Sequence, residues 1–72
     1  MNKEQMQKFL EDKGIEVTKS EGDDFSAVFH ISADDRVELD KNKTELEKET
    51  GLYFATSDMY GMSVVIMENH EQ

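Results

Sequence analysis

The segment FSAVFHIS, residues 25–32, has the clearest strand pattern of the chain. Every second residue in it is apolar, and this two-residue period is typical of a strand that buries one face. Upstream, Ile15 and Val17 alternate with polar neighbours and predict a shorter strand. The segment 21–24, Glu-Gly-Asp-Asp, is typical of a turn, so we expect the two strands to form a hairpin.

The residues before this hairpin carry the pattern of an amphipathic helix. Met6, Phe9 and Leu10 follow one helical face over residues 3–13. Asn2 is a favourable N-cap residue, and Gly14 suits the left-handed position that ends a helix. We therefore expect a helix from about residue 3 to residue 13.

The middle of the chain is less clear. A turn at residues 33–35 followed by alternating Val37 and Leu39 predicts a third strand. In residues 41–51, Thr44 and Glu47 match a capping box and favour a short helix. Leu46 is the single apolar residue among residues 41–51, so a helix there would have little to bury. An extended segment is therefore the alternative.

The C-terminal part predicts a second hairpin. The pattern predicts a strand over residues 52–56, a turn over 57–61 and a last strand over 62–67. Val64, Val65 and Ile66 are consecutive, which is typical of a strand that is central or buried on both faces. The expectation is a single α+β domain, residues 1–72, with an N-terminal helix packed on a four- to five-stranded antiparallel sheet.

Composition excludes several classes of function. The 72 residues carry a formal charge of −9 and no cysteine, which excludes iron–sulfur clusters and thiolate zinc sites. The longest apolar run is far below the roughly 20 residues that a membrane helix needs, and no leader sequence is apparent. We expect a cytoplasmic protein without a membrane partner.

The sequence contains no pattern of catalytic or cofactor-binding residues. His30 is expected on the half-exposed face of a strand, and the acidic segments do not fit the calcium loop of an EF-hand. The chain has no phosphate-binding glycine loop or nucleophile elbow. We therefore expect no enzyme activity, no metal and no cofactor. The charge of −9 also disfavours direct binding of nucleic acid.

The negative charge is concentrated in the middle of the chain. Residues 21–40 hold seven acidic residues and one basic residue, Arg36, for a net charge of −6. Carboxylates two residues apart on a strand lie about 6.6–6.8 Å apart, which is of the order of the phosphate spacing along one DNA strand. Glu38 with Asp40, and Glu45 with Glu47 and Glu49, form rows of this spacing if their segments are extended. A basic DNA-binding cleft would attract such rows. The candidate carboxylates are Glu21, Asp23, Asp24, Asp34, Asp35, Glu38, Asp40, Glu45, Glu47 and Glu49.

In size, charge and predicted layout, the chain resembles small acidic DNA-mimic proteins of phages, most of all an inhibitor of the histone-like nucleoid protein HU. The segment 47–51, Glu-Lys-Glu-Thr-Gly, and the segment 56–58, Thr-Ser-Asp, are similar to parts of the phage inhibitor of uracil-DNA glycosylase. The resemblance implies a host protein as partner, competition with DNA and a location at the nucleoid through that partner.

Other interpretations of the function and of the oligomeric state stay open. The chain could be an inhibitor of uracil-DNA glycosylase or of the anti-CRISPR type, or an acidic protein–protein adaptor without DNA mimicry. A homodimer is also open, because Tyr53, Met59, Tyr60 and Met62 could supply either surplus core or a dimer interface.

Overall fold

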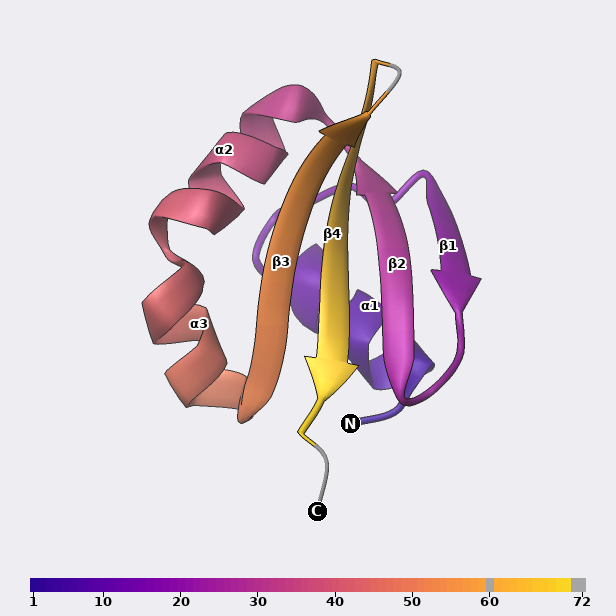
Figure 1. Cartoon of the computed structure of the whole chain (residues 1–72), viewed down its shortest axis with the longest axis vertical. Coiled ribbons are helices and arrows are strands. Elements are labelled where there is room, and N and C mark those ends of the chain that lie inside the picture. Colours follow the sequence, from indigo (N-terminus) through magenta and orange to yellow (C-terminus); the bar gives the residue numbers. More distant parts are fainter. Residues whose placement is uncertain (60, 71–72) are drawn as a thin grey trace.

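The computed structural model describes residues 1–59 and 61–70. They form an α+β fold with one antiparallel sheet (Figure 1). The elements are α1 (Lys3–Asp12), β1 (Lys19–Gly22), β2 (Ser26–Ile31), α2 (Ala33–Lys41), α3 (Lys43–Thr50), β3 (Leu52–Met59) and β4 (Met62–Asn69).

The sheet has four strands in the order β1-β2-β4-β3, with every neighbouring pair antiparallel. The last strand of the chain, β4, therefore lies between β2 and β3. This confirms the expected fold class and the central place of the last strand. β4 is not buried on both faces, however, since Val65 and Met67 are buried while Val64 and Ile66 are half-buried.

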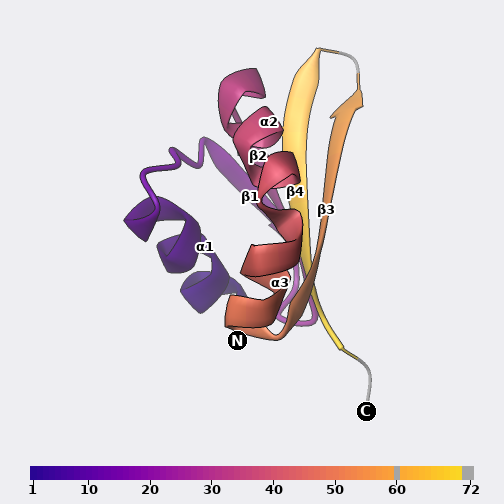
Figure 2. The ribbon, with the colours of Figure 1, turned by 90° about the vertical axis from the view of Figure 1, so that its left-hand side faces the viewer.

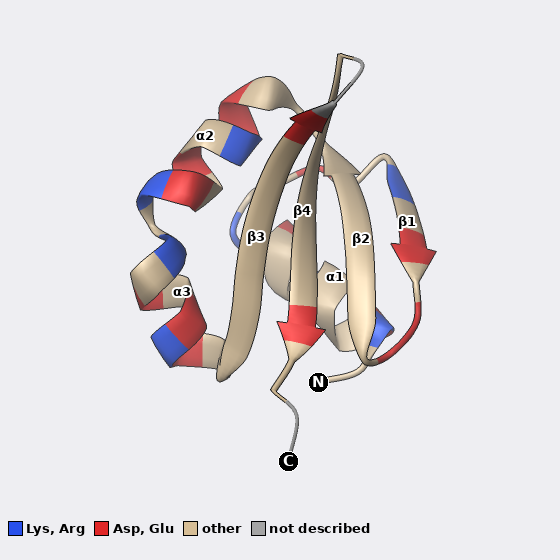
Figure 3. Ribbon diagram, viewed as in Figure 1, with Lys and Arg blue, Asp and Glu red and all other residues tan. Residues whose placement is uncertain are grey.

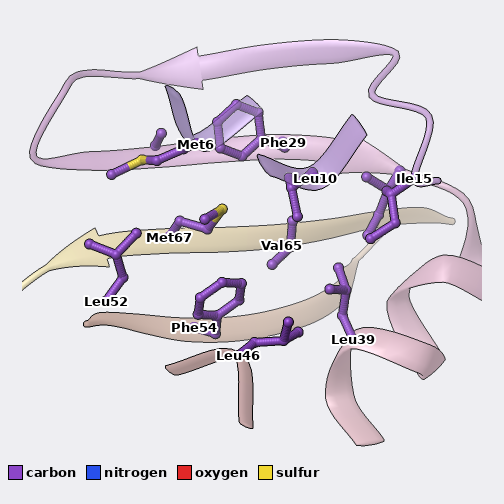
Figure 4. Close-up of a cluster of buried hydrophobic side chains, with 12 residues drawn as sticks. Met6, Leu10, Ile15, Phe29, Leu39, Leu46, Leu52, Phe54, Val65 and Met67 are labelled. Carbon is purple, nitrogen blue, oxygen red and sulfur yellow. The ribbon is translucent and has the colours of Figure 1, made fainter. Parts of the chain in front are cut away.

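The helices lie on one side of the sheet (Figure 2). α1 contacts β2, whereas α2 and α3 lie along β3 and α2 also reaches β4. The core fills the space between the two layers, with side chains from every helix and from three strands (Figure 4). Its buried members are Met6, Leu10, Ile15, Ala27, Phe29, Ile31, Leu39, Leu46, Leu52, Phe54, Val65 and Met67.

The opposite side of the sheet is called here the open face. The register of the three strand pairs places on it Lys19 and Glu21 of β1, Ser26, Val28 and His30 of β2, Tyr53, Ala55 and Ser57 of β3, and Met62, Val64, Ile66 and Glu68 of β4. In Figure 1 the strands lie in front of α1, so the open face is turned toward the viewer.

α1 forms as the sequence predicts. The Asn2 side chain accepts a hydrogen bond from the backbone N–H of Gln5, whose own side chain accepts from the N–H of Asn2. This reciprocal capping box satisfies two N–H groups that the first turn leaves free. Met6 and Leu10 are buried in the core.

The expected turn at residues 33–35 and the expected strand at Val37 and Leu39 are wrong, because these residues form α2. Ser32 caps the helix by accepting a hydrogen bond from the N–H of Asp35. Leu39 is buried, but Val37 is 42% exposed, so their alternation does not define a buried strand face. The helix dipole favours the acidic residues of the first turn.

Residues 43–50 are helical, so the extended alternative for this segment is wrong. Leu46 anchors α3 in the core that also holds Leu39. Gly51, at φ 72°, ends the helix in the left-handed conformation. Asn42 separates α2 from α3 and serves as the flanking residue of both.

The strand bounds also differ from expectation. The first strand begins at Lys19, and the predicted strand residues Ile15 and Val17 lie in the preceding loop, packed on the core. β3 continues to Met59, so most of the predicted turn 57–61 is strand. The side chain of Met59 and all of Tyr60 lie outside the described residues.

Candidate acidic partner-binding surface

Four of the ten candidate carboxylates line one groove: Asp35 and Glu38 of α2, and Glu45 and Glu49 of α3. The groove has a volume of about 330 Å³, and its apolar lining is Ile15, Leu39 and Leu46. Lys13 and Asn42 complete the lining. We call these four carboxylates the acidic stripe.

Helical geometry explains why these four residues gather. Positions 35, 38, 42, 45 and 49 are separated by three or four residues, which is the spacing of one helix face. The rise of about 1.5 Å per residue separates Asp35 from Glu38 by about 4.5 Å along the axis, and Glu45 from Glu49 by about 6 Å. The break at Asn42 leaves both acidic pairs on the same groove.

One lysine already lies in the groove. The Nζ atom of Lys13 is 3.2 Å from both carboxylate oxygens of Glu49 and 5.3 Å from the ring centroid of Phe9. The side chains of Lys13 and Glu49 are 42% and 52% exposed. An ion pair this exposed contributes little to stability. The contact between Lys13 and Glu49 does show that the groove accommodates an ammonium group.

Two other acidic residues of α2 and α3 are turned toward the sheet. Asp40 accepts a hydrogen bond of 3.2 Å from the Thr56 hydroxyl, and Glu47 accepts one of 2.9 Å from the backbone N–H of Phe54. The extended rows expected for residues 38–40 and 45–49 are therefore wrong. In a helix, residues two apart point in nearly opposite directions.

Asp23 and Asp24 hold the turn between β1 and β2. Asp23 accepts hydrogen bonds from the backbone N–H groups of Ser26 and Phe25, which lower the pKa of its carboxyl group. Asp24 accepts from the N–H of Lys3, in the first turn of α1. Both carboxylates stabilise the local backbone and lie away from the acidic stripe.

Glu21 lies on the open face of the sheet. Its carboxylate is 2.7 Å from Nε2 of His30, and this hydrogen bond lowers the pKa of Glu21, with a smaller effect from Lys19 at 3.9 Å. His30 lies on the face opposite Phe29, as predicted, with a side chain 15% exposed. Asp34 is exposed in the first turn of α2 and is not part of the groove lining.

The structure thus brings together four of the ten predicted carboxylates and separates the others. Figure 3 shows acidic and basic residues alternating along α2 and α3, while the strands carry few charges. Sequence reasoning missed Lys13 and Asn42 as part of the groove. The spacing of positions 35, 38, 42, 45 and 49 was the available signal, but it has meaning only once this segment is known to be helical.

Within the described part of the chain, no three histidine or acidic side chains are grouped so as to hold a metal ion. No helix among the described residues is long and apolar enough to span a membrane. Comparisons with protein-family models, with curated proteins and with solved structures found no match.

Proposed function

We propose that this protein binds the basic, DNA-binding surface of a partner protein through the acidic stripe and thereby competes with DNA. The observation that carries the proposal is the position of Asp35, Glu38, Glu45 and Glu49 along one groove. The family resemblance makes a nucleoid protein of the HU type the first partner to test.

The spacing of the stripe supports the proposal. Along each helix axis, the backbone positions of neighbouring stripe residues lie about 4.5–6 Å apart, of the same order as the spacing that suggested DNA mimicry in the sequence. A row of lysine or arginine side chains that normally holds phosphates would meet carboxylates instead. Association of this kind is fast, and it weakens as salt screens the charges.

Lys13 indicates how a partner would engage the groove. Its ammonium group pairs with Glu49 in the free protein, and both side chains remain substantially exposed. A lysine or arginine of the partner can replace Lys13 there at little energetic cost, because an exposed pair contributes at most about 1 kcal/mol. Leu39 and Leu46, next to the carboxylates, would contact the aliphatic part of the entering side chain.

The test is competition with DNA for HU in a gel-shift assay at about 0.1 M salt, where charges act over about 10 Å. We expect the protein to release DNA from HU. Direct binding to HU, followed by fluorescence anisotropy, should weaken steeply with added salt. Uracil-DNA glycosylase serves as a second DNA-binding probe. If neither protein releases DNA, the proposal is wrong for these targets.

A matched pair of variants tests the surface itself. Asp35→Asn/Glu38→Gln/Glu45→Gln and Glu4→Gln/Glu11→Gln/Asp12→Asn each change the formal charge from −9 to −6. The first set removes three carboxylates of the stripe, and the second removes three exposed carboxylates of α1. We expect the first set to abolish competition and the second to reduce it only slightly. Equal losses would mean that total charge, and not the groove, determines binding.

A further inference from the structure

The open face of the sheet is apolar at its centre, and no helix of the described residues lies over it, although the ring of His70 stacks on that of Tyr53 at one end. Val28, Val64 and Ile66 are half-buried, Ala55 is exposed, and Tyr53 and Met62 are 54% and 51% exposed. Antiparallel sheets with one face in water usually place polar residues there. All three described helices lie on the other side (Figure 2). A contiguous apolar patch of this kind marks an interaction surface.

The charges of the open face differ from those of the helical side. The register places three charged strand residues of the described chain on this face, Lys19, Glu21 and Glu68. The strands are mostly tan in Figure 3. In contrast, α2 and α3 together carry seven acidic and four basic residues. Two copies of a chain with a formal charge of −9 repel each other least when their open faces meet.

From this geometry, we infer that two copies of the chain pair through their open faces, with the two sheets packed against each other. The two-fold axis lies between the two sheets, parallel to the strands and above the gap between β2 and β4. It places β2 of one copy over β4 of the second copy. The register then sets Val28 against Ile66 of the second copy. The apolar centres of the two faces cover each other.

The same axis avoids contact between like charges. It places β1 over β3 of the second copy, so that Lys19 faces Ser57 and Glu21 faces Ala55. An axis running across the strands at the level of Val28 would instead place Glu21 over Glu21 of the second copy. Charge therefore favours the axis parallel to the strands.

The size of the face predicts a weak dimer. Four strands about 4.8 Å apart and about 20 Å long give a flat area of about 400 Å². Stable interfaces bury about 800 Å² of accessible surface on each partner, so even with the relief of the side chains added to the flat area, this face is at or below that size. We therefore expect a dimer that forms at high protein concentration and dissociates on dilution. In it the helical layers, with the acidic stripes, lie on the two outer sides. The inference goes beyond the proposed function and does not depend on it.

Sedimentation velocity from about 5 µM to about 500 µM tests the inference, because an interface of this size gives association in the micromolar range or weaker. The weight-average mass of the wild type should rise toward that of a dimer. Ile66→Lys should remain monomeric, since it places a lysine at the centre of each open face. Val37→Lys is the matched control, because Val37 is a 42% exposed residue of α2 and the charge change is the same.

A wild type that stays monomeric throughout this range would overturn the inference, as would a folded Ile66→Lys protein that dimerises like the wild type. Loss of the dimer in Val37→Lys would assign the interface to α2 and equally overturn it. If circular dichroism shows that Ile66→Lys is unfolded, Ile66→Thr replaces it, with dimerisation expected to weaken roughly tenfold. Concentration-dependent NMR shifts should map to Val28, Val64 and Ile66 rather than to the acidic stripe.

Discussion

The backbone N–H of Phe54 donates a hydrogen bond of 2.9 Å to Oε2 of Glu47. Phe54 belongs to β3, one of the two edge strands of the sheet, and Glu47 belongs to α3, which runs beside it. The Glu47 carboxylate thus accepts a hydrogen bond that the carbonyl group of a neighbouring strand would accept if β3 were not at the edge of the sheet. Edge strands with free N–H groups are prone to pair with other chains, so this contact both fixes α3 and covers part of the edge.

We predict that Glu47→Ala lowers the free energy of unfolding by about 1–3 kcal/mol, because a part-buried N–H loses a charged acceptor. Glu45→Ala is the matched control, since it removes the same charge from an exposed position of the same helix. Urea denaturation measures both. Equal effects of the two variants would show that the contact with Phe54 contributes nothing specific.

Gly22 provides a prediction about the first hairpin. Its φ is +87°, and a Cβ atom built there would overlap the carbonyl oxygen of Ser26 and lie 3.0 Å from Cα of Ala27. Gly14, at φ +84°, has no atom within 4 Å of such a Cβ. Both alanine variants incur backbone strain of about 1–2 kcal/mol, but only Gly22→Ala adds a clash with the neighbouring strand.

We therefore expect Gly22→Ala to lower the thermal midpoint clearly more than Gly14→Ala does. In a domain of 60–100 residues, each additional 1 kcal/mol corresponds to roughly 4–8 °C. Thermal unfolding followed by circular dichroism compares them. Midpoints that agree within error would show that the turn relaxes to admit the methyl group.

The contrast between β2 and α2 shows what the sequence could predict. β2 was predicted nearly to the residue, because its alternation coincides with burial at Ala27, Phe29 and Ile31. α2 was missed because one of its two alternating apolar residues, Val37, faces solvent. The acidic first turn behind Ser32 was a usable signal for a helix start.

The candidate site was predictable only in part, for the same reason. The sequence identifies which residues are carboxylates, but the secondary structure decides which of them share a face. With residues 33–50 treated as partly extended, Glu38 and Asp40 share one row. In the helix, Glu38 lines the groove while Asp40 bonds Thr56 of β3. The pairing of Lys13 with Glu49 joins residues 36 positions apart and has no local signature.

Acid should destabilise the β1–β2 hairpin. Folding lowers the pKa of Glu21 from 4.5, chiefly through its hydrogen bond with His30, and that of Asp23 from 3.8, through the N–H groups of Ser26 and Phe25. A carboxyl group whose pKa is lower in the folded state contributes stability above its unfolded pKa. That contribution is lost as pH falls through the folded value.

Between about pH 6 and about pH 3, the wild type should therefore lose more unfolding free energy than Glu21→Gln/Asp23→Asn, in which these two groups no longer titrate. The amides remain able to accept hydrogen bonds, so the hairpin should persist. Urea midpoints at the two pH values provide the comparison. Parallel losses in both proteins would mean that other carboxyl groups dominate the acid response.

Glu38 and Asp40 offer the sharpest test of the acidic stripe, since they are two residues apart on α2 and carry the same charge. Glu38→Gln should weaken binding to an HU-type partner by about threefold to tenfold. This is the effect expected from the loss of one exposed ion pair that contributes about 1 kcal/mol. Asp40→Asn should leave binding nearly unchanged, because its carboxylate faces Thr56. Fluorescence anisotropy at low salt measures both affinities. An extended row of carboxylates predicts equal losses, so equal losses would contradict binding through the groove.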